Sequence, residues 1–228
     1  QIPNSTSGVG TIYVHTYNSG TYIGTESKTF TLWVSGDMYP TLTYTTTGND
    51  LFNGLYITTK SSVSFSLSAT ESYGAKIKSY SISGQGLNVN SSNGKSSVFN
   101  SSGAFTYTLK ATDSRGRSVT KTHSISVYYY ANPSITLNTV RCDLNGNPTD
   151  IGNYVKATLV YSISNPNNAN QNAKNYVIEY KATDEENWTT FSNGTLSNYS
   201  STQNYTNTSK TFDSAKSYDF RASIEDSF

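Results

Sequence analysis

Strict alternation of apolar and polar residues recurs along this chain and restricts it to β-structure. The clearest run covers residues 62–68, where Val63, Phe65 and Leu67 point to one side and serines to the other. Further strands are predicted at residues 11–15, 28–34, 79–82, 105–111, 118–127, 154–161, 176–181, 188–191 and 218–224. Since no segment carries the i, i+3, i+4, i+7 stripe of an amphipathic helix, we expect an all-β fold without long helices.

The composition favours thin β-modules. Only 34% of the residues are hydrophobic and 14% are charged, but the chain contains 19 Tyr and 9 Phe. Low charge and many aromatic rings argue against disorder. Threonine and tyrosine suit a half-buried pleated surface, so each module can have a modest core.

Charge and cysteine content exclude several classes of partner. The net charge of +1 provides no basic field for phosphates, so we expect no nucleic acid partner. No run of about 18 apolar residues occurs, so we expect no membrane insertion. Cys142 is the single cysteine, so no internal disulfide forms and each module depends on its core.

Proline and polar clusters at residues 35–40 and 128–133 divide the chain into three blocks. The middle block has roughly 90 residues, close to the size of one immunoglobulin domain. The first 36 residues hold about three predicted strands, too few for an independent sandwich. We therefore predict the end of a preceding β-sandwich at 1–37, an Ig-like β-sandwich at 38–131 and a further β-sandwich, lacking its last strand, at 132–228.

Several local patterns occur in order along the chain: residues 2–8 with the strand ending at Tyr17 and then Ile23-Gly24, residues 73–80 and 112–118, residues 130–133, Arg141-Cys142-Asp143 with Gly146 and 150–154, and Asp226-Ser227-Phe228. Together they resemble one family, the minor structural proteins (tail fibre or baseplate-associated) of siphophages that infect Gram-positive bacteria. In the third block, 132–228, Tyr176, Ile178 and Tyr180 are followed by Trp188 and by Tyr218, Phe220 and Ala222, which resembles a fibronectin III-like β-sandwich.

The resemblance implies tandem immunoglobulin-like and fibronectin-like β-sandwiches in a structural component of a bacteriophage tail (fibre, tip or baseplate). It implies an extracellular location on the virion, a modular rod, a contribution to host-surface attachment and no enzyme activity. The expected partners are other tail subunits, host cell-wall carbohydrate and, in the full-length protein, two further copies in a homotrimer. No catalytic residue, metal site or cofactor is expected.

Two other functions stay open. A carbohydrate-binding or adhesin module would need two or three aromatic rings exposed together on one face. A non-catalytic accessory region of a cell-wall hydrolase would need a catalytic domain elsewhere in a longer chain. Fold alone does not separate these functions.

Two polar loops are candidate sites. The segment 113–117 offers two guanidinium groups for recognition, but we favour a hairpin turn in which Asp113 bonds its own backbone and Gly116 takes the left-handed conformation. The segment 143–150 places oxygen ligands at alternating positions, as calcium requires. Because Pro148 stands where a turn glycine is expected and no glutamate closes the loop, we favour a polar loop.

The remaining candidates favour structural roles. His15 and His123 are assigned to outer strand faces and provide too few ligands for a metal. Cys142 has no histidine in its block to activate it, so we expect a packed side chain. The tyrosines at 128–130 could stack on sugars, but packing between modules is favoured, and Trp33 and Trp188 are assigned to core or edge packing.

Overall fold

The computed structural model describes residue 2 and residues 4–228, and its regular structure is almost entirely β. Among these residues no α-helix occurs, and a single 3-10 turn, η1 (Pro166–Asn168), interrupts the strands, so the all-β prediction is confirmed. No helix in the described part is long and apolar enough to cross a membrane. The strands are β1 (Ser7–Asn18), β2 (Thr21–Trp33), β3 (Thr41–Asn49), β4 (Tyr56–Ile57), β5 (Ser62–Thr70), β6 (Ile77–Gly84), β7 (Leu87–Val89), β8 (Asn93–Lys95), β9 (Gly103–Asp113), β10 (Ser118–Tyr128), β11 (Ser134–Cys142), β12 (Tyr154–Ser162), β13 (Asn175–Ala182), β14 (Thr189–Thr195), β15 (Ser200–Thr206) and β16 (Tyr218–Glu225).

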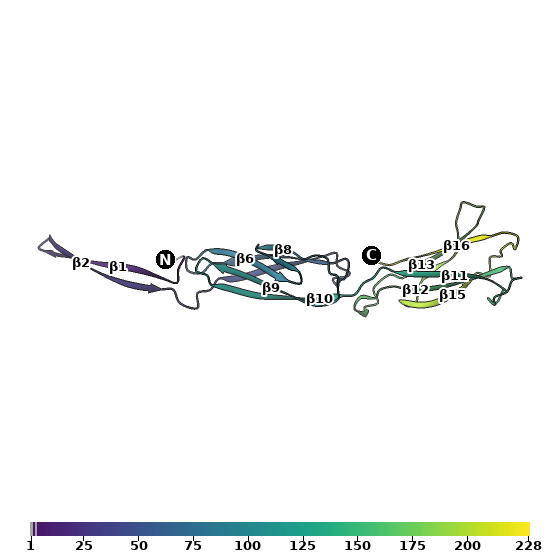
Figure 1. Ribbon diagram of the computed structural model, residues 1–228, viewed down its shortest axis with the longest axis horizontal. Helices are drawn as coiled ribbons and strands as arrows, with labels where there is room; N and C mark the ends of the chain where they lie inside the picture. Colours follow the sequence, from purple (N-terminus) through teal and green to yellow (C-terminus); the bar gives the residue numbers. More distant parts are fainter. Residues whose placement is uncertain (1, 3) are drawn as a thin grey trace. The chain divides into compact units, whose positions relative to one another are not determined.

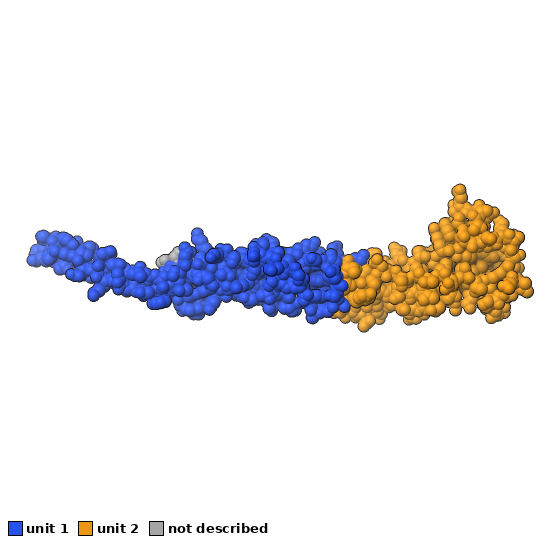
Figure 2. All heavy atoms as spheres, in the orientation of Figure 1, with its two compact units in different colours: residues 1–56, 60–127 blue, residues 57–59, 128–228 orange. Residues whose placement is uncertain are grey.

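The chain forms two compact units, coloured separately in Figure 2. Unit 1 comprises residues 1–56 and 60–127, and unit 2 comprises residues 57–59 and 128–228. Residues 1–37 cluster with unit 1. Their assignment to the end of a preceding sandwich stays a prediction.

In unit 1, β1 and β2 form a sheet of their own, which we call the ribbon (Figure 1). The strands pair antiparallel from Ser7↔Trp33 to Asn18↔Thr21. Ser19 and Gly20 join them with φ values of 47° and 83°, and two positive φ values define the hairpin turn that matches strand twist. The ribbon thus contains two long strands where about three short ones were expected. Both faces of the ribbon are exposed to solvent, so the sequence need not alternate between apolar and polar residues there. Without that alternation, the ends of the strands are hard to predict from the sequence.

The rest of unit 1 consists of two sheets packed across a common core. One sheet has the order β3-β5-β8 and the other β4-β10-β9-β6-β7. Val63, Phe65 and Leu67 of β5 are all buried, as the alternation predicted. They meet residues of the second sheet, and β9 and β10 pair around the predicted hairpin turn. The core comprises Leu42, Val63, Phe65, Leu67, Ile82, Phe99, Phe105, Tyr107, Leu109, Ala111, Ile125 and Val127.

Unit 2 repeats this construction with two three-stranded sheets, β11-β12-β15 and β14-β13-β16. Alternate residues of β12 and β13 point into its core, among them Leu159 and Ile178, which are fully buried. An aromatic group fills one end of this core, with Phe212 5.0 Å from Tyr180 between ring centroids. The core comprises Ala157, Leu159, Tyr161, Ile163, Tyr176, Ile178, Phe191, Leu196 and Phe212.

The composition of segment 165–172, rich in asparagine, is typical of a solvated connector, but Asn172 within it is buried. The Asn172 amide nitrogen donates to the Ser164 carbonyl at 2.8 Å and to Asp226 Oδ2 at 3.2 Å. Its amide oxygen accepts from the Ser227 backbone N–H at 2.9 Å. A buried amide is tolerated when its donors and acceptor are satisfied, and composition alone does not show that these partners are within reach.

Candidate functional site

Reactive side chains do not gather in the described part of the chain. It contains no group of three or more His, Cys, Asp or Glu residues able to hold a metal ion. His15 lies exposed on the ribbon, where its Nδ1 is hydrogen-bonded to the Thr25 hydroxyl. Cys142 is buried, and burial raises the pKa of its thiol, which keeps it protonated and packed.

The outward assignment of His123 was wrong. His123 is directly paired with Tyr107, a core residue, and shares its strand face with the buried Ile125. Its ring lies 5.8 Å from the Phe65 ring, and its Nδ1 lies 3.4 Å from the Tyr44 hydroxyl. Positions 123 and 125 have the same parity in β10, so both point inward, and the imidazole is accommodated at the edge of the core beside a polar hydroxyl.

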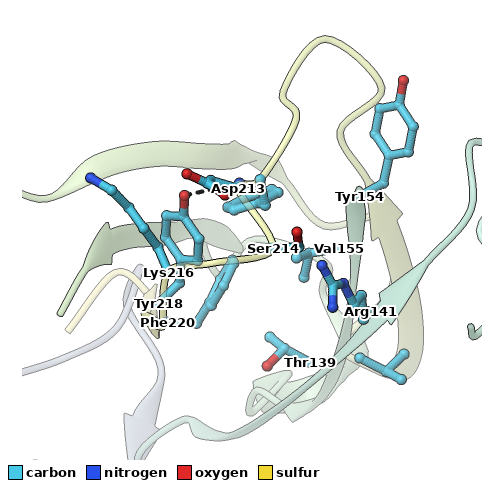
Figure 3. Close-up of a pocket in the computed structure, with 11 residues that line it drawn as sticks. Thr139, Arg141, Tyr154, Val155, Asp213, Ser214, Lys216, Tyr218 and Phe220 are labelled. Atoms are coloured by element: carbon cyan, nitrogen blue, oxygen red, sulfur yellow. Dashed lines mark hydrogen bonds between the residues drawn. The ribbon is translucent and has the colours of Figure 1, made fainter. Parts of the chain in front are cut away.

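A pocket of about 220 Å³ opens in unit 2 (Figure 3). Arg141 and Lys216 lie on opposite sides of it. The lining contains no histidine or cysteine, and its one carboxylate belongs to Asp213. The lining residues are Thr139, Val140, Arg141, Tyr154, Val155, Phe212, Asp213, Ser214, Lys216, Tyr218 and Phe220.

Two charged side chains of this pocket, Arg141 and Asp213, hold local structure. Arg141 donates from Nε to the Gly152 carbonyl at 2.6 Å and from Nη1 to the Asp150 carbonyl at 3.0 Å. Asp213 Oδ1 accepts the Ala215 backbone N–H, and the Asp213 N–H donates to the Tyr218 hydroxyl.

The turn interpretation of residues 113–117 is confirmed. Asp113 Oδ1 accepts the backbone N–H groups of Arg115 and Arg117, both at 2.9 Å, and Gly116 has a φ of 84°. The two guanidinium groups bind backbone carbonyls within unit 1. Arg115 donates to Ile2, Ser72 and Tyr73, and Arg117 donates to Met38 and Val34. These arginines fasten the base of the ribbon to the β9–β10 turn.

The oxygen-rich segment 143–150 repeats this turn. Asp143 Oδ1 accepts the backbone N–H groups of Asn145 at 2.9 Å and Asn147 at 2.8 Å. Its Oδ2 accepts the Asn147 side-chain amide at 3.0 Å. The Asn147 side chain, with backbone N–H groups of the turn, holds the pKa of Asp143 below its usual value. Both carboxylate oxygens thus serve the turn, which favours the polar-loop interpretation over a calcium site.

The aromatic candidates differ in how far they are buried. Tyr130 is buried in unit 2, with its ring 4.3 Å from Phe228, while Tyr129 is exposed, so residues 128–130 make no common platform. Trp188 is partly buried and carries the Arg221 guanidinium 4.2 Å from its ring centroid, which is edge packing as expected. The same expectation was wrong for Trp33, which is 75% exposed at the end of β2.

The feature that sequence reasoning missed is the apolar surface of the ribbon. Its register places alternate residues on two faces. We call one the tyrosine face, with Val9, Tyr13, Tyr17, Tyr22 and Trp33, and the other the aliphatic face, with Ile12, Val14, Phe30 and Leu32. All nine side chains are exposed. Exposed apolar side chains gathered on a strand face are a common feature of interaction surfaces. Clusters of β-branched and aromatic residues in a segment predicted to complete a sandwich were the available signal.

Comparison with known proteins assigns the chain to a viral family. No curated protein matches it. One family model matches residues 1–228, the whole chain, and is described as "Siphovirus protein of unknown function (DUF859)". The chain therefore belongs to this family of siphovirus proteins.

Proposed function

We propose that this chain is a non-catalytic structural component of the siphovirus tail, in a fibre, tip or baseplate. In this proposal, tandem immunoglobulin-like and fibronectin-like modules form a modular rod and contribute to attachment at the host surface. The observation that carries the proposal is that Asp113 and Asp143 in the loops, and Arg141 in the pocket of Figure 3, hold local backbone structure, in a chain whose family is siphoviral.

Strand order supports the domain types. In unit 1 the order β10-β9-β6-β7 corresponds to strands G-F-C-C′ of a variable-type immunoglobulin domain, and β3-β5-β8 corresponds to A-B-E. In unit 2 the orders β11-β12-β15 and β14-β13-β16 correspond to A-B-E and C′-C-F, without a strand G. Modules of this kind fold around their own cores.

Immunogold electron microscopy tests the tail location. Antibodies raised against the purified chain are applied to virions of the siphovirus that encodes it. We expect gold on the tail, and we expect the label to vanish when the antibody is first saturated with purified chain. Gold confined to the capsid, or virions in which mass spectrometry finds no peptide of this chain, would refute the proposal.

The tyrosine face favours cell-wall carbohydrate as a second candidate, as a ligand of the same tail protein. Tyr17 and Tyr22 are each more than half exposed, and their ring centroids lie 5.7 Å apart. Flat rings with polar hydroxyls suit sugars, because their faces cover apolar C–H groups while the hydroxyls stay hydrated.

A cell-wall pull-down tests this candidate. The chain is incubated with purified walls of the host, and the bound fraction is compared with that of the Tyr17→Ala/Tyr22→Ala variant. We expect the double variant to lose binding, whereas Tyr129→Ala, which removes an exposed ring of unit 2, leaves binding intact. Equal binding of all three proteins, or none, removes the candidate.

A further inference from the structure

The aliphatic face of the ribbon is only partly covered by the rest of the described chain, because Ile2 lies against Gly8 and lines a pocket together with Leu32 at one end of the face. Ile12, Val14, Phe30 and Leu32 are between 40% and 59% exposed. These side chains have no polar atoms that could be hydrated, in contrast to the tyrosines on the opposite face. β1 and β2 pair only with each other among the described strands, so each also has an open edge. We propose that this face binds the same face of a second copy of the chain.

The low stability expected of a two-stranded ribbon on its own supports a binding partner on the aliphatic face. A two-stranded hairpin without a third strand or a packed layer is marginally stable in water. This ribbon is long, with 12 residues in β1 and 13 in β2, and ordering each residue costs conformational entropy. Burial of its four large apolar side chains offsets part of this cost, and a second copy on the aliphatic face supplies further burial.

The charges on the same face favour an identical partner. Glu26 is paired with Val14, and Lys28 is paired with Ile12, so one acid and one base lie two positions apart among the aliphatic side chains. A two-fold axis that crosses the face between these positions brings Lys28 of one copy against Glu26 of the other. In such an isologous contact the pairing occurs twice.

The same register also fits in shape. It places Ile12 against Val14 of the second copy, and Phe30 against Gly24 of the second copy. Nothing lies within 4 Å of the position that a Cβ of Gly24 would occupy, so there is room above it for the Phe30 ring, which lies across Gly10 of its own copy. A face about 40 Å long and about 10 Å wide covers roughly 400 Å² on each copy, or roughly 800 Å² in total, which is the size of a weak, reversible association.

Sedimentation equilibrium of the 228-residue chain tests the dimer. Between about 1 and about 100 µM, the range of modest interfaces, we expect a mass of twice the 24.9 kDa chain. Ile12→Thr/Val14→Thr keeps β-branched residues in the strand and is expected to weaken dimerisation by about tenfold or more. The matched control Val140→Thr/Val160→Thr changes two exposed valines of unit 2 and is expected to dimerise like the original chain.

A charge exchange separates the interface from a folding defect. Glu26→Lys is expected to weaken dimerisation, and Glu26→Lys/Lys28→Glu to restore it, with the same circular dichroism spectrum in all variants. A monomer throughout the concentration range would overturn the proposal. So would a dimer that the Ile12 and Val14 changes leave intact, or a double exchange that fails to restore association. This inference does not rest on the tail location, because either can fail while the other holds.

Discussion

At the scale of single residues, two aspartates in different units make the same turn. Asp113 and Asp143 each accept two backbone N–H groups on one carboxylate oxygen, two and four residues ahead. In each turn the glycine three residues ahead, Gly116 or Gly146, has a positive φ and donates its N–H to the aspartate carbonyl. A short acidic side chain before such a glycine closes a tight loop because it mimics a backbone acceptor. The two aspartates differ in burial, which separates their contributions.

We predict that Asp113→Ala lowers the free energy of unfolding of unit 1 by about 2–3 kcal/mol, because two N–H groups lose their acceptor at a fully buried position. Urea unfolding followed by hydrogen exchange in β9 and β10 measures this loss. Asp143→Ala is the comparison, with a smaller loss in unit 2, because water replaces the missing acceptor in a more open turn. An equal effect of both changes would contradict this explanation.

Tyr130 predicts a stability change at alkaline pH. Burial, with the nearby Asp226 carboxylate, raises the pKa of Tyr130 from its ordinary value of 10.0 to about 12. The native state therefore favours the neutral phenol. The neutral phenol therefore contributes fully to the free energy of unfolding below pH 10. This contribution is lost as the pH rises from 10 towards 12.

Tyr130→Phe tests this linkage, because it keeps the ring that contacts Phe228 and removes the ionising group. We predict that the unfolding free energy of unit 2 falls less steeply above pH 10 in this variant than in the original chain. Urea unfolding monitored in unit 2 at a series of pH values gives both slopes. Parallel slopes in the two proteins would mean that Tyr130 does not titrate differently in the folded and unfolded states.

At the scale of elements, the end of β11 and the loop before β12 pack too closely for any side chain at Gly152. A Cβ at this position would lie 1.9 Å from the Cys142 carbonyl oxygen, which is backbone and cannot turn away. Arg141 in turn holds the Gly152 carbonyl at 2.6 Å. The loop is thus held by the close backbone contact at Gly152 and by the hydrogen bond from the Arg141 guanidinium. Arg141 also lines the pocket in Figure 3.

We predict that Gly152→Ala destabilises unit 2 by about 3 kcal/mol or more, because the loop must separate from β11. Gly36→Ala is the control, since nothing lies within 4 Å of its Cβ position, and its effect is expected to stay below about 1 kcal/mol. Thermal unfolding of both variants measures the difference. A Gly152→Ala protein as stable as the control would show that the loop relaxes freely.

At the scale of the whole molecule, each unit has a hydrophobic core made of its own residues. Leu109 in unit 1 and Leu159 in unit 2 are both fully buried, each between two sheets. The β-sandwich identity of both modules and the tail role remain proposals, whereas the division into two compact units follows from the fold. Stability in such a chain is a property of each core.

We predict that Leu109→Ala and Leu159→Ala each cost about 2–5 kcal/mol, but only in the unit that contains the substitution. Hydrogen exchange measured by mass spectrometry resolves this, because peptides from β9 and from β12 report on different units. Faster exchange in both units from either substitution would show that the two cores unfold together.

Features of the fold could be predicted from the sequence where residues close together in the sequence determine them. The inward set Val63, Phe65 and Leu67 and the hairpin at Asp113 were both predictable, because strand parity and turn chemistry are local. The burial of Asn172 was not, because its partners lie up to 55 residues away. The inward orientation of His123 was predictable, because it lies two residues before Ile125 in the same strand. The prediction failed because the polarity of histidine was given more weight than its position in the strand.

The amino-acid sequence by itself determined that this chain is β-structure in several small sheets, since alternation with many β-formers permits little else. Only the tertiary structure decided that residues 7–33 form a ribbon of their own with two apolar faces. Alternation of apolar and polar residues shows which residues share a face of a strand. Whether another sheet packs on that face depends on contacts between distant segments, so no local pattern shows that the face stays exposed.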